Sequence, residues 1–159
     1  LYKKGWKGIN IDIHSFSIDL FNYIRTKDLN YNFAISDKNE ILNMYYQKEL
    51  SQLSTIDYEQ AKKVFQGPIK EKKIQALTLN EILKRSKIEK KIDLLDIDVE
   101  GVDHKALQSL SFDKHKPELI CVEIHEKNIK ESITFKFLDS FNYELIWSGV
   151  FSHIFRSKS

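Results

Sequence analysis

Residues 91–107, KIDLLDIDVEGVDHKAL, combine an apolar run with acidic side chains. The run over 92–99 predicts a buried strand, Gly101 ends it, and residues 102–110 have the spacing of a helix. A carboxylate inside such a strand needs a compensating partner, because removing a charge from water is costly. A strand that leads directly into a helix is typical of a sheet that helices cover on both faces.

The rest of the chain repeats this alternation. Apolar periodicity predicts strands over residues 8–13, 29–35, 40–46, 69–77, 118–124, 143–147 and 150–155. Helical spacing predicts helices over residues 18–25, 58–65, 79–86, 102–110 and 129–141. Four local expectations accompany these elements: a cap from Ser15 or Ser17, a capping box over 78–81, a turn at 37–39 that pairs the strands on either side, and an exposed, lysine-rich strand at 69–77.

This order of elements predicts one α/β domain over residues 1–159, built on an open and mostly parallel sheet. The two last strands are joined across Ser148 and Gly149, so they predict an antiparallel hairpin at the edge of that sheet. Ligands of such sheets bind beyond the carboxyl ends of the strands, where the strand order reverses. The polar residues at the strand ends are therefore the candidates for function.

Acidic side chains end the strand over 92–99. Because side chains alternate along a strand, Asp96, Asp98 and Glu100 point to one face, with Asp96 deepest and Glu100 at the mouth. Asp96 is either a ligand contact or a buried carboxylate that accepts hydrogen bonds from backbone amides. Asp98 and Glu100 are either site residues or solvated loop residues.

The strand over 118–124 ends in a similar way, since Glu123 and His125 share one face. If the two strands are parallel neighbours, their polar ends meet in one crevice and can perform acid/base chemistry or bind a divalent cation. His125 as an ordinary polar residue is the alternative. The candidate catalytic residues are Asp98, Glu100, Glu123 and His125, and the candidate metal ligands are Asp98, Glu100 and Glu123.

Two further strand ends suggest a nucleotide site. Asp12 ends the strand over 8–13, and a carboxylate in that position can accept both hydroxyls of a ribose. Ser36 and Asp37 end the strand over 29–35, where an adenine edge is expected. The alternatives are a helix cap for Asp12 and a simple turn for Ser36 and Asp37. The candidate cofactor-binding residues are Asp12, Ser36, Asp37 and Asp96.

Bulk composition excludes several classes of protein. The chain has 159 residues, 42% hydrophobic and 30% charged, and a formal net charge of +2, which gives no broad signature of nucleic-acid binding. The sequence predicts no membrane span, because no apolar stretch approaches the roughly 20 residues that a membrane helix needs. The single cysteine, Cys121, cannot form an internal disulfide, so a reducing compartment such as the cytoplasm is expected.

Five blocks in order resemble the FkbM family of S-adenosylmethionine-dependent methyltransferases. They are GWKGINIDIH, LNYNFAISD, TLNEIL, IDLLDIDVEGVDHKALQSLSF and KPELICVEIHE, spread over residues 5–126. The resemblance implies a Rossmann-like class I methyltransferase fold, a seven-stranded sheet whose last strand is antiparallel. It also implies methyl transfer from S-adenosylmethionine to a hydroxyl of a sugar or other small metabolite. By position, it implies ribose binding by Asp12, adenine-side contacts by Ser36 and Asp37, and site roles for the acidic strand ends.

One expected part of the family is missing. The family has a first strand and a glycine-rich turn that approaches the cofactor, and neither matches this sequence, which begins at Leu1 rather than Met. We therefore expect the chain to be the later part of a longer domain. In this fold the first strand lies between the strands over 8–13 and 92–99, so both of those strands are expected to have unpaired edges.

The residues suggest a mechanism and two rival functions. His125 or Asp98 is expected to take the acceptor's proton while Glu100 orients the acceptor, or a divalent cation lowers the hydroxyl pKa instead. A non-catalytic remnant or binding module is the first rival, because the glycine turn is missing. A haloacid-dehalogenase-like phosphatase is the second, with Asp96 as nucleophile and Asp98 as acid.

Overall fold

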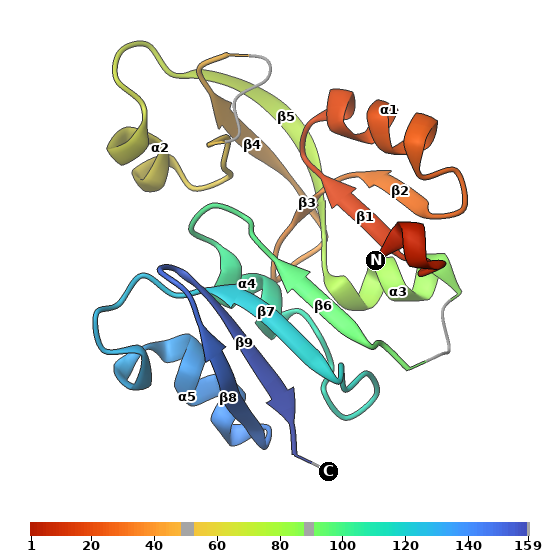
Figure 1. The fold of residues 1–159 in the computed structure, drawn as a ribbon. Helices are drawn as coiled ribbons and strands as arrows, with labels where there is room; N and C mark the ends of the chain where they lie inside the picture. Colours follow the sequence, from red (N-terminus) through yellow and green to blue (C-terminus); the bar gives the residue numbers. More distant parts are fainter. Residues whose placement is uncertain (49–52, 88–90, 159) are drawn as a thin grey trace.

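Strand pairs and helices alternate along the chain, as the sequence predicts (Figure 1). The computed structural model describes residues 1–48, 53–87 and 91–158. The strands are β1 (Ile9–Asp12), β2 (Leu29–Asn32), β3 (Ala34–Ile35), β4 (Glu40–Tyr46), β5 (Lys70–Leu77), β6 (Leu94–Ile97), β7 (Leu119–Glu123), β8 (Tyr143–Ser148) and β9 (Ser152–Ser157). The α-helices are α1 (Ser15–Ile24), α2 (Tyr58–Val64), α3 (Leu79–Ser86), α4 (Asp103–Gln108) and α5 (Ile133–Ser140), and two 3₁₀ turns are η1 (Tyr2–Lys4) and η2 (Ile129–Glu131).

The strands form three sheets rather than one. Their orders are β1-β2, β3-β5-β4 and β6-β7-β9-β8. The mixed α/β class is confirmed, but the single sheet of seven strands is not what the described residues form. In the described part of the chain β1 and β6 each lie at the end of a sheet and do not pair with each other, which agrees with the expected pair of free edges.

The predicted strand over 29–35 divides at Phe33, because the chain changes partner there. β2 pairs with β1 in parallel, whereas β3 pairs with β5 in parallel. The predicted pairing across the turn at 37–39 is therefore wrong, since β5 lies between β3 and β4. β5 is also not simply exposed: Lys70 and Lys73 are exposed and Lys72 is partly buried, while Ile74, Ala76 and Leu77 are buried.

The four-stranded sheet carries the main core. β6 and β7 are parallel neighbours, and the closing hairpin forms the far edge of the sheet, as predicted, with β9 inserted antiparallel between β7 and β8. On one face Ile97, Ile120 and Val122 are buried against side chains of α3, α4 and α5. Figure 1 shows α4 and α5 behind this sheet. Burial of this face fixes the register of β6 and β7, because a slip by one residue would expose it.

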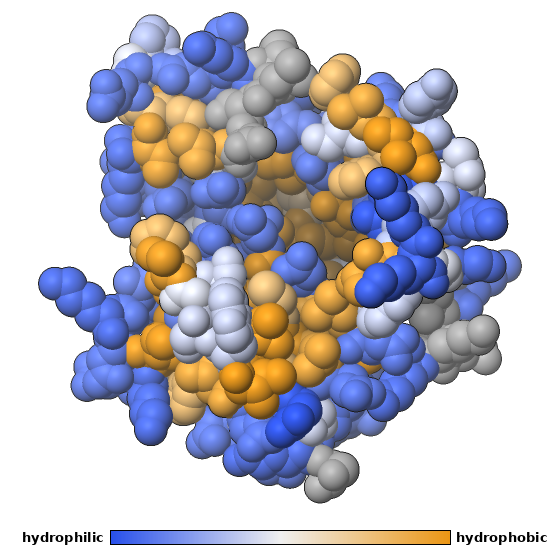
Figure 2. Space-filling model, viewed as in Figure 1, coloured by the Kyte–Doolittle hydropathy of each residue, from blue (hydrophilic) through white to orange (hydrophobic). Residues whose placement is uncertain are grey.

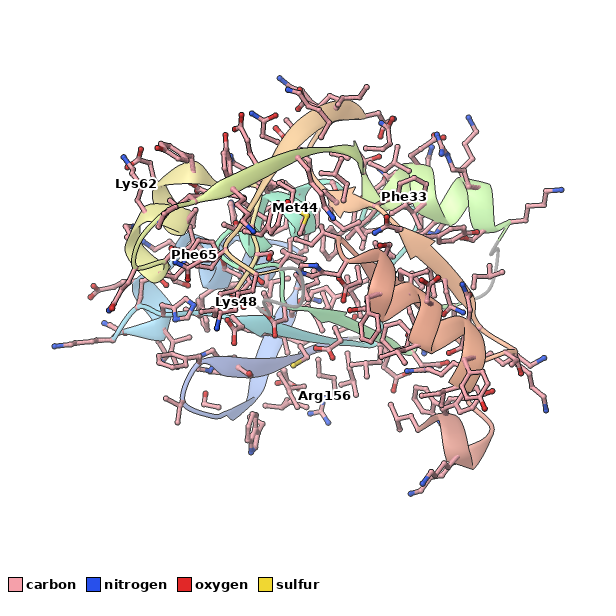
Figure 3. All side chains as sticks on the ribbon, turned by 90° about the horizontal axis from the view of Figure 1, so that it is seen from above. Phe33, Met44, Lys48, Lys62, Phe65 and Arg156 are labelled. Atoms are coloured by element: carbon pink, nitrogen blue, oxygen red, sulfur yellow. The ribbon has the colours of Figure 1, made fainter. Side chains whose placement is uncertain are left out.

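A smaller core lies beneath the three-stranded sheet. Ala34, Met44, Ile74 and Ala76 form it, and partly buried side chains of Ile13 and Ile56 pack against them. Figure 3 shows Met44 toward the middle of the molecule, while Lys62 projects from α2 at its edge. Ile13 and Ile56 also line the cavity described below, so this core supports one wall of the site.

Side chains that accept backbone hydrogen bonds cap the starts of α2, α3 and α5, but not those of α1 and α4. The Thr78 hydroxyl accepts from the Glu81 amide at 3.1 Å, so this half of the predicted capping box is confirmed. Neither Ser15 nor Ser17 caps α1: its N-cap residue is His14, which makes no side-chain capping bond. The predicted helix over 129–141 breaks at Ser132, whose hydroxyl accepts from the Phe135 amide and begins α5.

Candidate active site

A cavity of about 570 Å³ opens where β1 and β6 end. Polar and apolar side chains share its walls, and acidic side chains lie at the ends of the two strands. The lining residues fall into two groups: polar Asp12, His14, Ser17, Ser54, Thr55, Asp98 and Glu100, and apolar Ile11, Ile13, Phe16, Leu20, Phe33, Ala34, Ile35, Ile56, Val99 and Val102. Figure 2 shows a hollow in the middle of the molecule with hydrophobic residues at its base. A concave pocket that combines apolar side chains with converging polar groups is the usual form of a small-molecule site.

Asp12 lies at this cavity with one carboxylate oxygen committed to the protein. Its Oδ1 atom accepts a hydrogen bond from the His14 amide at 2.7 Å, which holds the turn between β1 and α1. Among the described residues the Oδ2 atom has no hydrogen-bond partner, so it can accept from a ligand. The imidazole of His14 also lines the cavity, and its Nε2 atom is buried without a partner in the described part of the chain.

The loop after β6 turns sharply as it reaches the cavity. Asp98 is exposed at the rim, and Glu100 adopts a left-handed backbone conformation with φ of 48°, followed by Gly101 with φ of 90°. Positive φ is unfavourable for a residue with a Cβ atom, so Glu100 must be held by its surroundings. Asp98 and Glu100 both line the cavity, while their roles in a site stay a prediction.

Asp103 is a buried carboxylate that the sequence analysis missed. It begins α4, and its Oδ1 atom accepts from the Val99 amide at 3.2 Å, closing the loop that carries Glu100. Burial raises its pKa, and backbone hydrogen bonds partly oppose that effect. Asp103 thus accepts the backbone hydrogen bond that the sequence analysis considered for Asp96. The sequence does contain a sign of this role, because Asp103 lies four residues after Val99 at the predicted start of a helix.

Asp96 lies elsewhere. It is exposed on the face of the sheet opposite the core and does not line the cavity, so the expectation of a deep carboxylate is wrong. Its partner on the neighbouring strand β7 is Cys121. Burial and this neighbouring carboxylate raise the pKa of Cys121 to about 12. A thiol with that pKa is a poor nucleophile at neutral pH.

Glu123 and His125 form a pair next to the cavity rather than in its lining. The His125 Nε2 atom is 3.4 Å from Glu123 Oε2, and the His125 ring contacts the ring of Phe151 at 4.8 Å between centroids. Burial raises the pKa of Glu123, and the charge of Asp98 raises it further. Burial also raises the pKa of Glu100, followed by the charges of Asp98 and Glu123. Because β6 and β7 are parallel neighbours, their polar ends lie at the same edge of the sheet, but only the end of β6 lines the cavity, so the common crevice stays a prediction.

The adenine-side candidates are not in the lining. Ser36 is buried, its amide donates to the Leu77 carbonyl, and its hydroxyl donates to the exposed Asp37 at 3.1 Å. Their neighbours Ala34 and Ile35 line the cavity instead. The sequence analysis did not identify Ser54 and Thr55 as site residues, because nothing local to them shows that their segment reaches the end of β6.

The candidate metal ligands do not form a metal site. Over residues 1–48, 53–87 and 91–158, no group of three or more His, Cys, Asp or Glu side chains has the arrangement that a metal ion requires. Asp98, Glu100 and Glu123 influence one another's charge without converging on one point. In the same ranges, no helix is long and apolar enough to cross a membrane.

Comparison with known proteins assigns a family. The model of the methyltransferase FkbM domain matches residues 1–145. The chain belongs to the FkbM methyltransferase family. This result confirms the resemblance drawn from the sequence blocks, and it supports a general function for the chain as a methyltransferase. No curated protein and no solved structure matches the chain in the other two comparisons.

Proposed function

We propose that this FkbM domain transfers a methyl group from S-adenosylmethionine to a hydroxyl of a sugar or other small metabolite. One observation carries the proposal: the carboxyl ends of β1 and β6 open on the same cavity. Asp12 lies at one strand end, and Asp98 and Glu100 lie at the other. A nucleoside held at Asp12 and a hydroxyl held at the acidic rim would then share one space.

The residues present fit the nucleoside part of that cofactor. The Oδ2 atom of Asp12 can accept from ribose hydroxyls, and the rings of Phe16 and Phe33 with the aliphatic Ile35 give an apolar wall for a base. No lining residue in the described part of the chain is a glycine, so the family's glycine-rich turn is not represented there. Asp12 remains a proposed contact, while Ser36, Asp37 and Asp96 lie outside the lining.

The acidic rim suits removal of a proton from a hydroxyl. S-adenosylmethionine supplies a methyl group that is already activated by its sulfonium. The protein must therefore align the acceptor oxygen and accept its proton. Asp98 and Glu100 repel each other as anions, so uptake of one proton by the pair relieves that repulsion. In this proposal Asp98 takes the proton, Glu100 orients the acceptor, and the Glu123–His125 pair binds further acceptor hydroxyls.

Calorimetric titration of the chain with S-adenosylhomocysteine tests the proposal. The variant Asp12→Asn keeps the acceptor oxygen for the His14 amide but replaces the other oxygen with a donor. We expect it to lower the affinity about tenfold or more, the effect of losing a charged hydrogen bond. Asp19→Asn, an exposed change on α1, is the matched control and should leave the affinity unchanged.

Failure to bind by both this chain and a form extended upstream through the family's first strand and glycine-rich turn would contradict the proposal and favour a non-catalytic module. The phosphatase alternative has less support, because it requires Asp96 and Asp98 in one site and only Asp98 lines the cavity. A saccharide or other small-molecule acceptor and a cytoplasmic location stay predictions from the sequence.

A further inference from the structure

Thr55 connects two parts of the molecule that are far apart in sequence. Its side chain is almost fully buried, and its backbone forms an antiparallel bridge with Tyr45 of β4. Its hydroxyl donates a hydrogen bond of 2.8 Å to the carbonyl oxygen of Glu100, 45 residues away. The same hydroxyl accepts from the Asp57 amide at 3.0 Å, so its donated hydrogen has a fixed direction.

The acceptor of that bond is the residue that needs support. Glu100 has φ of 48° and is followed by Gly101 with φ of 90°, so two consecutive residues are left-handed. Such a conformation costs a residue with a side chain of order 1–3 kcal/mol and persists only where the surroundings fix it. Thr55 supplies a polar contact to this turn, and the side chain of Gln60 from α2 lies against Gly101.

We propose that Thr55 is a positioning residue that holds Glu100 in its left-handed conformation at the cavity. The hydrogen bond orients the Glu100 peptide group, and this orientation directs the Glu100 side chain toward Asp98 and Glu123. Ser54, Thr55 and Ile56 also line the cavity, so the bond joins one wall to the acidic rim. The consequence for ligand binding rests on the proposed function, whereas the conformational role does not.

The test compares Thr55→Val, which keeps the shape and removes the hydroxyl, with Thr55→Ser, which keeps the hydroxyl. The readout is the backbone chemical shifts of Glu100 and Gly101 in nuclear magnetic resonance spectra of the full chain. We expect Thr55→Val to move these shifts toward those of ordinary negative-φ backbone, and Thr55→Ser to restore the wild-type values. Wild-type shifts in Thr55→Val would overturn the proposal.

Ser109→Ala is the matched control for general destabilisation. Ser109 is buried outside the cavity lining, and its hydroxyl accepts from the Leu79 amide at 2.9 Å and donates to the Ala106 carbonyl at 2.7 Å. Its loss should lower stability and leave the Glu100 and Gly101 shifts unchanged. If Ser109→Ala moved those shifts as Thr55→Val does, the effect would be unspecific and the proposal would be wrong.

A double-mutant cycle keeps the test decisive if Thr55→Val does not fold. Glu100→Gly removes the left-handed strain, so Thr55→Val should fold in that background even where it does not fold in the parent. Failure of Thr55→Val to fold in both backgrounds would refute the coupling. Titration with S-adenosylhomocysteine measures the consequence for ligand binding separately. If neither the wild-type chain nor its upstream-extended form binds, only the proposed function is contradicted, because the spectroscopic result is independent of it.

Discussion

Asp28 is the most fully bonded acidic side chain near β1. Its carboxylate is inaccessible to solvent and accepts from the Gly8 amide at 3.0 Å, from Asn10 Nδ2 at 3.1 Å and from Arg25 Nε at 2.7 Å. These bonds tie the start of β1 to the end of α1. Burial alone would raise the pKa of Asp28, but the hydrogen bonds from Gly8, Asn10 and Arg25 lower it below 3.8.

Replacing Asp28 should therefore be costly. Asp28→Ala leaves three donors without their acceptor, and we expect the free energy of unfolding to fall by about 2–3 kcal/mol. Urea denaturation at pH 7 measures the change. Asp19→Ala on the exposed face of α1 should change it by less than about 0.5 kcal/mol. If both variants lost a similar free energy of unfolding, the buried hydrogen bonds of Asp28 would not be the source of its stabilisation.

The lowered pKa of Asp28 also fixes the sign of a pH effect. Because the folded state binds this proton more weakly than the unfolded chain, the stabilisation is fully present above pH 3.8 and is lost as pH falls through the folded pKa. Asp28→Ala should remove this part of the acid destabilisation. Denaturation midpoints of the wild type and Asp28→Ala are measured between pH 3 and pH 6. If both proteins lost stability equally on acidification, Asp28 would not be the group responsible.

The sequence predicts residue contacts that follow local rules, but not contacts that depend on how distant elements pack. Asp98 and Glu100 were predicted as partners because side-chain alternation along a strand is a local rule. Thr55 and Glu100 meet only because β4 and α2 pack beside β6, and no local pattern encodes that contact. Asp96 was expected to be deep because its neighbours are apolar, yet its face of the sheet is the exposed one.

At the scale of elements, the β6–α4 connection depends on its glycine. Gly101 has φ of 90°, and an added Cβ atom would lie 3.1 Å from the Gln60 Cγ atom. We expect Gly101→Ala to lower the free energy of unfolding by about 1–2 kcal/mol, the cost of a left-handed residue with a side chain. Thermal or chemical denaturation measures this loss.

Gly8→Ala is the matched control, because its φ is not in the left-handed region and nothing lies within 4 Å of an added Cβ atom. It should be almost neutral, since the Gly8 amide that bonds Asp28 is kept. A larger loss at Gly8 than at Gly101 would contradict the strain argument.

Element boundaries followed the sequence where local chemistry sets them. The start of α3 was predicted from Thr78 and Glu81, because a capping bond spans only three residues. The division of residues 29–35 into β2 and β3 was not predicted, because Phe33 marks a change of partner strand rather than a change of propensity. The break at Ser132 was missed since its capping role depends on where α5 packs.

At the scale of the whole molecule, acidic groups gather at the carboxyl ends of β6 and β7. Burial raises the pKa values of Glu100, Glu123 and Asp103, and like charges raise them further. The folded state therefore binds these protons more tightly than the unfolded chain. By linkage, stability should fall as pH rises from the ordinary glutamate value of 4.5 through the raised values.

Glu123→Gln should reduce this decline, because it removes one charge from the cluster. We expect the variant to lose less stability than the wild type between pH 4.5 and pH 8, as followed by denaturation midpoints. Glu40→Gln, an exposed change at the start of β4, should leave the wild-type slope unchanged. A slope that is the same in all three proteins would refute the electrostatic account.

Global strand pairing was the least predictable feature. The α/β class followed from the alternation of elements, whereas the sequence left the parallel contact of β6 with β7 as a condition that the structure meets. The insertion of β9 between β7 and β8, and of β5 between β3 and β4, depends on long-range burial that no segment reveals alone.

The lone thiol described at β7 makes the molecule convenient for probes. Raising the pKa of Cys121 from 9.0 to about 12 lowers its thiolate fraction about a thousandfold at neutral pH. Val150 at the hairpin tip is 85% exposed, so a cysteine introduced there would not have its pKa raised by burial. Maleimide spin labels or fluorophores should therefore attach selectively to the introduced position, and the motion of the hairpin beside the acidic rim could be followed without deleting the native cysteine.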